Sequence, residues 1–295
     1  MNLERAKFIL IIAFACLNLF LGYHLFWPDF GRLTQVAVSA EDLRQLDLLL
    51  NQNNYYLENS IDRSVQTGIF MTVSTSLEFR RQVLLKFLQE GAQFSNTEDG
   101  TYYRKDDKTA IIQSTGLITV IYTPPIETDE NLAESEQREL RSYIEHFLRE
   151  QHLMPEGAVF DYLEATETGE VILRYYQAVD DCPVFAGHLR VTTEEASIKS
   201  VEIYWLNPIE SEPSREMEVI TAAAALANFV RDMGPSTEPQ FITDVSLGYF
   251  SGEYDAEKWE IPPVWRILLQ EGQIYYINAF TGNIEQESVI PEQLP

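Results

Sequence analysis

The chain has 295 residues, of which 45% are hydrophobic and 23% charged, a composition typical of a folded protein and not of a disordered one. Its formal net charge is −25, and residues 31–295 hold all of that excess, because residues 1–30 contain two basic and two acidic side chains. Such an acidic surface repels phosphate backbones and anionic headgroups, which excludes nucleic-acid binding. The acidity either keeps an exposed domain soluble or forms a patch for a basic partner.

The first predicted element is a membrane helix over residues 8–26. Phe8 to Phe26 is a run of nineteen residues without a charge, and at a rise of about 1.5 Å per residue it is long enough to cross the hydrocarbon core of a bilayer. A secretory signal peptide is the alternative, but the run is too long for one. It also ends in Tyr23, His24 and Trp27 and not in a small-residue cleavage site. We therefore expect an uncleaved anchor in the lipid bilayer.

The flanks of this run predict its orientation. Arg5 and Lys7 precede it, whereas Asp29 and a single Arg32 follow it. Since basic flanks stay in the cytoplasm, we expect residues 1–7 to form a cytoplasmic tail and the C-terminal region to lie outside the cell membrane. The two cysteines, Cys16 and Cys182, are placed too far apart to pair, which favours a bacterial protein.

One side of the predicted membrane helix carries small and polar residues. Ile11, Ala15, Asn18 and Gly22 share a stripe, since they follow i, i+4, i+7 and i+11 spacing. Small residues let helices approach closely in lipid, and an amide can hydrogen-bond across the contact. The stripe is therefore a candidate partner-binding seam; the simpler alternative is a plain anchor that tolerates one Asn.

Residues 36–123 are expected to form a first extracytoplasmic α+β domain. A helix over 39–52 starts at Ser39, and a second helix starts at a Thr75-x-x-Glu78 capping box and ends at Gly91. The predicted strands are 69–73, 101–105, 109–113 and 117–122. Residues 124–134, acidic and containing two prolines, are the expected linker.

Residues 135–290 are expected to form a second α+β region with two sub-modules, 135–207 and 217–288. The first opens with an amphipathic helix around 140–148 and continues with strands at 158–165, 170–179, 183–193 and 197–207. The other has a helix over 217–232 and strands at 241–250, 263–270, 273–280 and 283–288. The predicted architecture is a set of modules in which a helix crosses one face of a curved antiparallel sheet.

The residue patterns predict neither an enzyme nor a cofactor or metal site. The four histidines are not spaced to bind one ion, and Cys182 has no evident base beside it. Acidic pairs at 106–107, 180–181 and 194–195 occupy turn signals, where they are more simply solvated loop residues than general acids and bases. Nucleophile elbows, phosphate loops and zinc motifs do not occur in the sequence.

Three stretches of the sequence resemble the YycI (WalI) family. They are the opening RAKFILIIAFACLNLFLGYHLF, the middle stretch YYQAVDDCPVFAGHLRVTT, and the tail running from ITAAAALANFV to PPVWRILLQEGQIYYINAFTGNIE. The last strands also look like a PepSY or cystatin-like strand pair, a broader resemblance. The YycI resemblance implies a single-pass accessory protein of Gram-positive bacteria. With its sister YycH, such a protein tunes the sensor histidine kinase of the WalK–WalR (YycG–YycF) two-component system, which governs cell-wall metabolism.

The resemblance supplies no single functional residue, and the sign of regulation, the stoichiometry and any sensed ligand do not follow from the sequence. A different interpretation is a membrane-tethered extracellular binding module, such as a PepSY-like protease inhibitor or a receptor for a wall polymer. The two differ in what they require of residues 8–26: a specific sequence in the first case, and any anchor in the second.

Overall fold

A computed structural model describes residue 14 and residues 38–89, 91–98, 100–127, 137–166, 168–195, 197–209 and 216–288. Within these ranges the fold is α+β, and most of the strand pairing is antiparallel. The described part of the chain contains no helix long and apolar enough to cross a membrane. The predicted membrane helix over residues 8–26 lies outside the described residues except for Phe14.

The helices are α2 (Ala40–Gln52), α3 (Leu77–Gln89), α4 (Gln137–Glu150) and α5 (Ala222–Met233). The strands are β1 (Tyr55–Leu57), β2 (Thr67–Gly68), β3 (Met71–Thr75), β4 (Gln93–Thr97), β5 (Gly100–Lys105), β6 (Lys108–Ile112), β7 (Ile118–Ile126), β8 (Ala158–Ala165), β9 (Glu170–Val179), β10 (Cys182–Glu194), β11 (Ser197–Tyr204), β12 (Leu206–Pro208), β13 (Met217–Glu218), β14 (Gln240–Tyr249), β15 (Trp259–Ile261), β16 (Pro263–Leu269), β17 (Ile274–Asn278) and β18 (Ile284–Ser288).

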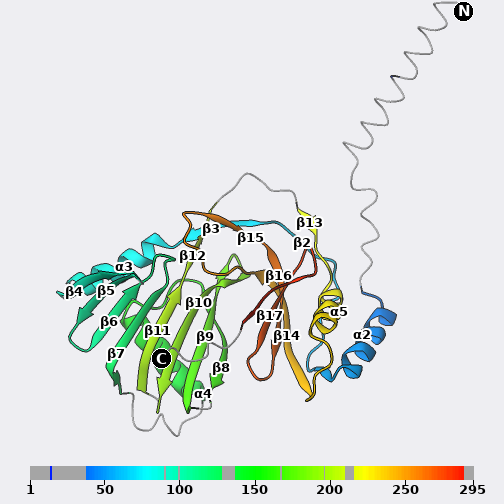
Figure 1. The fold of residues 1–295 in the computed structure, drawn as a ribbon, viewed down its shortest axis with the longest axis horizontal. Helices are drawn as coiled ribbons and strands as arrows, with labels where there is room; N and C mark the ends of the chain where they lie inside the picture. Colours follow the sequence, from blue (N-terminus) through cyan, green and yellow to red (C-terminus); the bar gives the residue numbers. More distant parts are fainter. Residues whose placement is uncertain are drawn as a thin grey trace, which may run out of the picture.

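Thirteen of the strands form one sheet in two halves (Figure 1). The first half runs β4-β5-β6-β7-β11-β10-β9-β8, and the second half contains β1, β14, β16, β17 and β18. The halves meet where Val184 of β10 pairs with Tyr249 of β14, the single register pair between those two strands. This pair joins residues of the two expected sub-modules, 135–207 and 217–288. Strands β4–β7 of the expected first domain belong to the first half, where β7 pairs with β11, and β1 of that domain pairs with β14 in the second.

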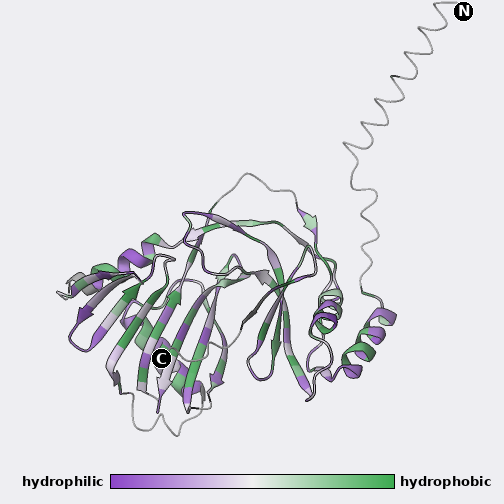
Figure 2. Ribbon diagram, viewed as in Figure 1, coloured by the Kyte–Doolittle hydropathy of each residue, from purple (hydrophilic) through white to green (hydrophobic). Residues whose placement is uncertain are grey.

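The first half has its core on the face that α3 and α4 cover. Hydrophobic and hydrophilic residues alternate along several of these strands (Figure 2), so that one face of the sheet supplies the core. Ile144 and Leu148 of α4, Leu173 of β9 and Leu189 of β10 are completely buried there. Phe79 and Val83 bring α3 into the same core. The face of β8–β11 opposite α4 carries the charged residues described below.

The second half is covered by α5 and α2, which stack at the right of the sheet in Figure 1. Helix α5 begins at Thr221, whose hydroxyl accepts a hydrogen bond from Ala224 N–H at 3.2 Å. Its small residues Ala222 and Ala225 are fully buried, so the helix lies close to the sheet beneath. Helix α2 begins with a capping box between Ser39 and Asp42, which confirms the predicted start.

Several predicted boundaries differ from the structure. Thr75 ends strand β3, and the hydroxyl of Ser76 accepts from Phe79 N–H at 3.4 Å. The predicted capping box at Thr75 is therefore wrong, and Ser76 makes a single cap bond, because Phe79 has no side-chain acceptor to bond back. Residues 217–218 form strand β13 and not the first turn of the predicted helix, because Thr221 caps α5. Strand β7 continues to Ile126 through both prolines of the expected linker. Strands β1, β4 and β15 were not predicted.

Candidate binding cleft

A cleft of about 290 Å³ opens between the two halves of the sheet. Strands β8, β9 and β10 form one wall, and strand β17 with the segment that follows β14 forms the other. Its charged and aromatic lining residues include Asp161, Arg174, Tyr176, Phe185, His188, Arg190, Phe250 and Tyr276. Because the cleft contains both guanidinium groups and aromatic rings, it can offer hydrogen bonds and flat apolar contacts together.

The cleft exists because strand β10 bulges at residues 185–187. Val184 pairs with Gln177 of β9, and His188 pairs with the preceding Tyr176, so the three residues between have no partner across β9. Gly187 lies against the side chain of Gln177, and a Cβ at position 187 would collide with Gln177 Oε1. The bulge turns Phe185 away from the first core and into the space between the halves.

A buried ion pair joins the two halves at the base of the cleft. Arg266 Nη2 of β16 lies 2.7 Å from Asp161 Oδ1 of β8, and the two side chains are 3% and 14% exposed. Burial acts to lower the pKa of Arg266, but the charge of Asp161 outweighs it, so the pKa is raised. Tyr162 adds a second link, since its hydroxyl donates to Gly272 O at 3.2 Å.

Aromatic rings fill the space next to this ion pair. The guanidinium of Arg266 lies 4.9 Å from the ring centroid of Phe185, and Phe185 in turn lies 5.6 Å from Tyr176 and 5.9 Å from Tyr276. Phe250 stacks on Tyr276 with centroids 3.7 Å apart. Burial raises the pKa of the Tyr276 hydroxyl, which therefore stays protonated. These rings belong to both halves and fix the width of the cleft.

A second charged group lies on the open face of β9, β10 and β11. Glu202 Oε1 is 3.0 Å from Arg190 Nη1 and 3.6 Å from His188 Nε2. Burial would raise the pKa of Glu202, but the hydrogen bond from His188 and the charge of Arg190 outweigh it, and the pKa is lowered. Arg190 Nε is buried and has no hydrogen-bond partner among the described residues.

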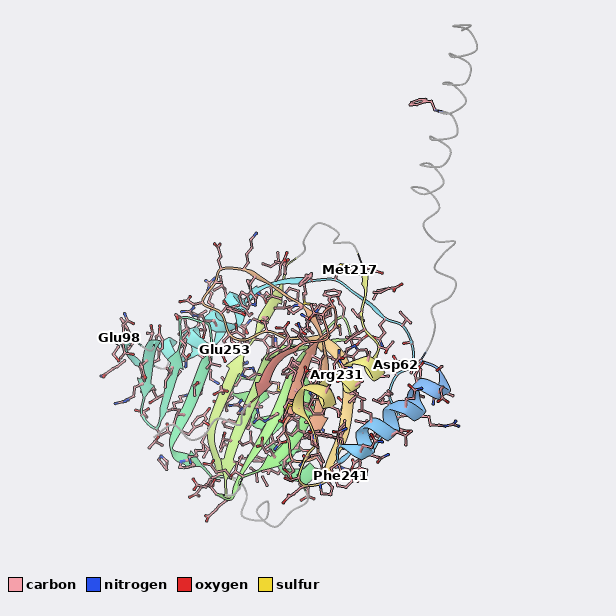
Figure 3. The ribbon with its side chains drawn as sticks, turned by 45° about the vertical axis from the view of Figure 1, so that its right-hand side comes forward. Asp62, Glu98, Met217, Arg231, Phe241 and Glu253 are labelled. Atoms are coloured by element: carbon pink, nitrogen blue, oxygen red, sulfur yellow. The ribbon has the colours of Figure 1, made fainter. Side chains whose placement is uncertain are left out.

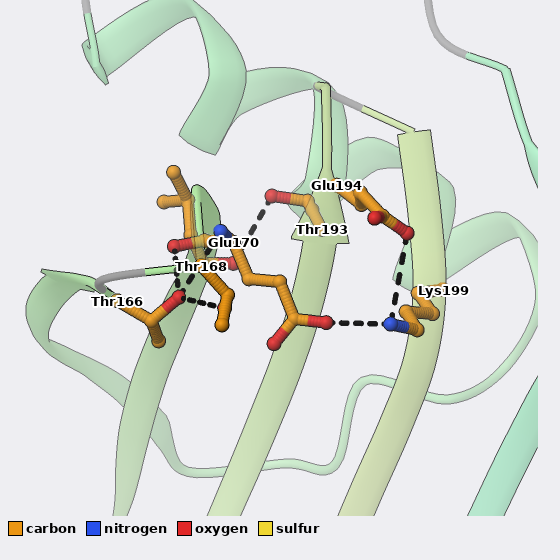
Figure 4. A network of polar contacts seen from close by, with 7 residues as sticks. Thr166, Thr168, Glu170, Thr193, Glu194 and Lys199 are labelled. Carbon is orange, nitrogen blue, oxygen red and sulfur yellow. Dashed lines mark hydrogen bonds and ion pairs between the residues drawn. The ribbon is translucent and has the colours of Figure 1, made fainter.

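A third polar network lies away from the cleft and is more exposed (Figure 4). Lys199 of β11 contacts Glu170 of β9 at 2.5 Å and Glu194 of β10 at 3.6 Å, and its side chain is 43% exposed. Thr193 is buried, and its hydroxyl donates to Val171 O at 3.0 Å. This network ties the ends of three strands together, and solvent weakens its ion pairs.

Comparison with known proteins identifies the family. The family model described as YycI protein matches residues 33–280, which is most of the chain. The chain belongs to the YycI family. This membership confirms the resemblance seen in the sequence. Members of the YycI family are regulatory accessory proteins of the YycG/WalK system and are not known as enzymes.

Other comparisons add little to this assignment. No curated protein matches the chain. A solved structure of an uncharacterized protein from Eubacterium rectale ATCC 33656 is similar with a TM-score of 0.49 and 12% sequence identity, covering 79% of this chain and 91% of that one. The assignment of this YycI-family chain therefore rests on the family match.

The residues predicted to form a partner-binding seam and the histidines differ in where they lie. Ile11, Ala15, Asn18 and Gly22 lie outside the described residues. Of the three histidines in the described ranges, His146, His152 and His188, the last is the one that lines the cleft. Nowhere in the described ranges do three or more His, Cys, Asp or Glu side chains group as metal ligands.

The pairs 106–107 and 180–181 lie in turns, as predicted, whereas in the pair 194–195 only Glu195 lies in a turn and Glu194 ends strand β10. Asp106, Asp180, Asp181 and Glu195 all have positive φ angles, between 47° and 64°. Cys182 is partly exposed, and burial raises the pKa of its thiol, which keeps the thiol protonated. Sequence reasoning did not identify the Asp161–Arg266 pair. Part of its signal was present, because Arg266 is the single charge of the otherwise apolar strand β16, whereas β8 contains Glu164 as well as Asp161.

Proposed function

We propose that the chain is a single-pass membrane protein that modulates a WalK/YycG-like sensor histidine kinase by direct contact, together with a YycH-like sister protein. The observation that carries this proposal is the YycI family match over residues 33–280. The uncharged run over residues 8–26 supports an anchor, with the N-terminus in the cytoplasm and the remainder outside. In this proposal the organism is a Gram-positive bacterium, and the kinase controls cell-wall homeostasis.

A contact protein changes kinase output only if it binds the two states of the kinase with different affinity. Two surfaces could provide this difference. One is the stripe Ile11, Ala15, Asn18 and Gly22, where the amide of Asn18 would meet a partner helix. The other is the region outside the membrane, in which the Asp161–Arg266 pair and the Tyr162–Gly272 hydrogen bond link both halves. A partner bound to one half is thereby coupled to the other.

The test compares three versions of the full chain in native membranes. In one, residues 8–26 are replaced by an unrelated apolar helix; in the second, Asn18→Leu is combined with Gly22→Leu. The third carries Ile12→Leu with Phe20→Leu, which changes residues away from the stripe and serves as the matched control. We expect the first two versions to lose copurification with the kinase and to shift expression of the genes under its response regulator. The control should retain both.

If all three versions copurify with the kinase and leave its output unchanged, the hypothesis that residues 8–26 contact the kinase within the membrane is wrong. If no version, including the unaltered chain, copurifies with a histidine kinase or changes its output, the regulatory proposal as a whole is wrong. Crosslinking from position 18 identifies the captured helix independently of the expression measurement.

The cleft favours a second candidate, a membrane-tethered binding module. Its mixed lining of guanidinium groups and aromatic rings is typical of a ligand site. If this candidate is right, an unrelated apolar helix should replace residues 8–26 without loss of ligand binding, whereas Arg190→Ala should abolish ligand binding. The helix exchange above therefore separates the two candidates.

A further inference from the structure

Strand β4 is an unprotected edge of the large sheet. It is the last strand of the first half and pairs on one side alone, with β5. All five of its residues, Gln93 to Thr97, are exposed. Figure 3 shows Glu98, the residue that follows the strand, at the outer margin of the molecule. An edge of this kind presents unpaired backbone N–H and C=O groups to any further strand.

The other edges of this sheet carry protective features that β4 lacks. Strand β8 has a bulge between Phe160 and Tyr162 and contains Asp161 and Glu164. Strand β18 contains two glutamates, and β1 is three residues long. Bulges, charges and short length are the means by which proteins prevent edge-to-edge pairing. Strand β4 contains no charged residue and no proline, and its pairing with β5 is regular.

The charge around β4 is balanced, in contrast to the rest of the chain. Residues 76–126 contain six basic and six acidic side chains, so the net charge of −25 lies entirely elsewhere. Two copies of so acidic a protein repel each other through most of their surface. A contact through residues 76–126 brings together two surfaces without net charge. It therefore avoids this repulsion and keeps the acidic regions of the two copies apart.

The absence of charge within β4 also indicates what kind of partner it fits. In an antiparallel contact across a two-fold axis, the residue on the axis meets itself, and every other residue meets the one equally far beyond the axis on the same strand of the other copy. A charged edge would therefore face its own charge, whereas an uncharged strand of Gln, Phe, Ser, Asn and Thr meets only neutral groups. A different partner would not require this neutrality, because opposite charges could then be paired.

The apolar side chain of strand β4 itself, Phe94, is exposed. Phe94 is 66% exposed, although its ring is 6.2 Å from that of Tyr103 on the next strand. Phe94 and Tyr103 lie on the face of the sheet that α3 covers, since Tyr103 packs against the core shared with that helix. A second copy at β4 would remove part of this apolar surface from water.

We infer that two copies of this chain pair antiparallel through β4, continuing the large sheet across a two-fold axis. The contact leaves the cleft free in both copies, because no residue of β4 lines it. It does not depend on the proposed function, since it needs only the edge and its neutral surroundings.

The first experiment measures the mass of the detergent-purified full-length chain by sedimentation over a range of concentrations. The chain should form a dimer, and Ser95→Lys should weaken it about ten-fold or more, because each copy then places its charge opposite that of the other. Gln82→Lys is the matched control, since it adds the same charge to the exposed side of α3 without touching the edge. It should leave the dimer unchanged.

The second experiment tests proximity in membranes and does not depend on how a lysine affects folding. Cys16 and Cys182 are replaced by Ser, and a single cysteine is introduced by Ser95→Cys, by Asn96→Cys or, as the control, by Gln82→Cys. Mild oxidation should link two copies through position 95 or 96 and not through position 82. A monomer at all concentrations, a dimer that persists in Ser95→Lys, or equal crosslinking at position 82 would each overturn the inference.

Discussion

The side-chain amide of Gln177 forms two hydrogen bonds with the backbone of Leu206. Gln177 Nε2 donates to Leu206 O at 2.6 Å, and Leu206 N–H donates to Gln177 Oε1 at 3.1 Å. Gln177 is 4% exposed, so both bonds are shielded from water. They connect β9 to β12 and hold in place the side chain on which the bulge at Gly187 packs.

Replacing this amide should strongly destabilise the protein. In Gln177→Ala the buried N–H and C=O of Leu206 lose their partners, and unsatisfied groups of this kind cost about 1–3 kcal/mol each. We expect the free energy of unfolding, measured by urea denaturation, to fall by about 2–4 kcal/mol. Gln82→Ala, at an exposed position of α3, should change it by less than about 0.5 kcal/mol. A loss for Gln177→Ala as small as that of the control would contradict this role.

The contact between Gln177 and Gly187 predicts a coupling between two substitutions. Gly187→Ala alone should destabilise the fold by about 1–3 kcal/mol, because its Cβ meets the Gln177 side chain. In the Gln177→Ala background the contacts with Oε1 and Cδ are gone, but the Cβ of residue 177 is still 2.8 Å away. The cost of Gly187→Ala should therefore fall only in part, by about 1 kcal/mol. A double-mutant cycle of unfolding free energies measures the difference, and strictly additive losses would show that the contact has no energetic effect.

The ion pair at the base of the cleft should be costly to break from one side. Arg266→Met leaves the carboxylate of Asp161 buried without its partner, a change that costs about 3–5 kcal/mol in comparable pairs. Combining it with Asp161→Leu should recover most of the loss, since no unpaired charge remains. Lys199→Met is the control, because its pair with Glu170 is exposed and should contribute less than about 1 kcal/mol.

Unfolding of the three variants by urea at neutral pH provides the comparison. Equal losses for Arg266→Met and Lys199→Met would mean that burial of the Asp161–Arg266 pair adds nothing. A double variant less stable than Arg266→Met would mean that packing, and not the unpaired charge, dominates the single loss.

The lowered pKa of Glu202 predicts how stability changes at acid pH. A carboxylate whose pKa is lower in the folded state than its ordinary value of 4.5 stabilises the fold at pH values above 4.5. That contribution is lost as the pH falls through the folded-state pKa, because both states then bind the proton. Glu202→Gln should therefore be less stable than the unaltered chain at pH 7, and the gap between them should narrow toward pH 3.

Thermal unfolding of both proteins at a series of pH values tests this expectation. Asp107→Asn, in an exposed turn, is the control and should follow the unaltered chain throughout. A gap that stays constant with pH would show that Glu202 acts through packing and not through its charge.

Local patterns in the sequence predicted most of the elements. The strands at 158–165 and 170–179 have the observed bounds of β8 and β9, because their apolar runs end at clear turn residues. Strand β4 was missed since Gln93–Thr97 contains a single apolar side chain, Phe94, and pairing with β5 determines its conformation. Strand β1 was missed because three residues carry too little periodicity.

The candidate cleft could not be predicted from spacing. Asp161 and Arg266 are 105 residues apart in the sequence, and only the meeting of β10 and β14 brings their strands together. The bulge that opens the cleft depends on contact between Gly187 and Gln177, which belong to different strands. Isolated charges within apolar strands do mark such residues as candidates, but they do not identify which charge pairs with which.

The placement of α2 and β1 has a consequence for the order in which the protein can fold. These elements, residues 40–57, pack against α5 and pair in parallel with Gln240–Ile242 of β14, and Asn54 donates to Ser236 O across 182 positions of sequence. During synthesis, α2 and β1 therefore cannot make these contacts until residues up to about 242 have emerged from the ribosome. Contacts between residues so far apart in the sequence also form slowly. Until then their leucines remain accessible to chaperones and proteases. A chain truncated after residue 209 should accordingly be cleaved rapidly within residues 38–57, whereas the complete chain should be resistant there.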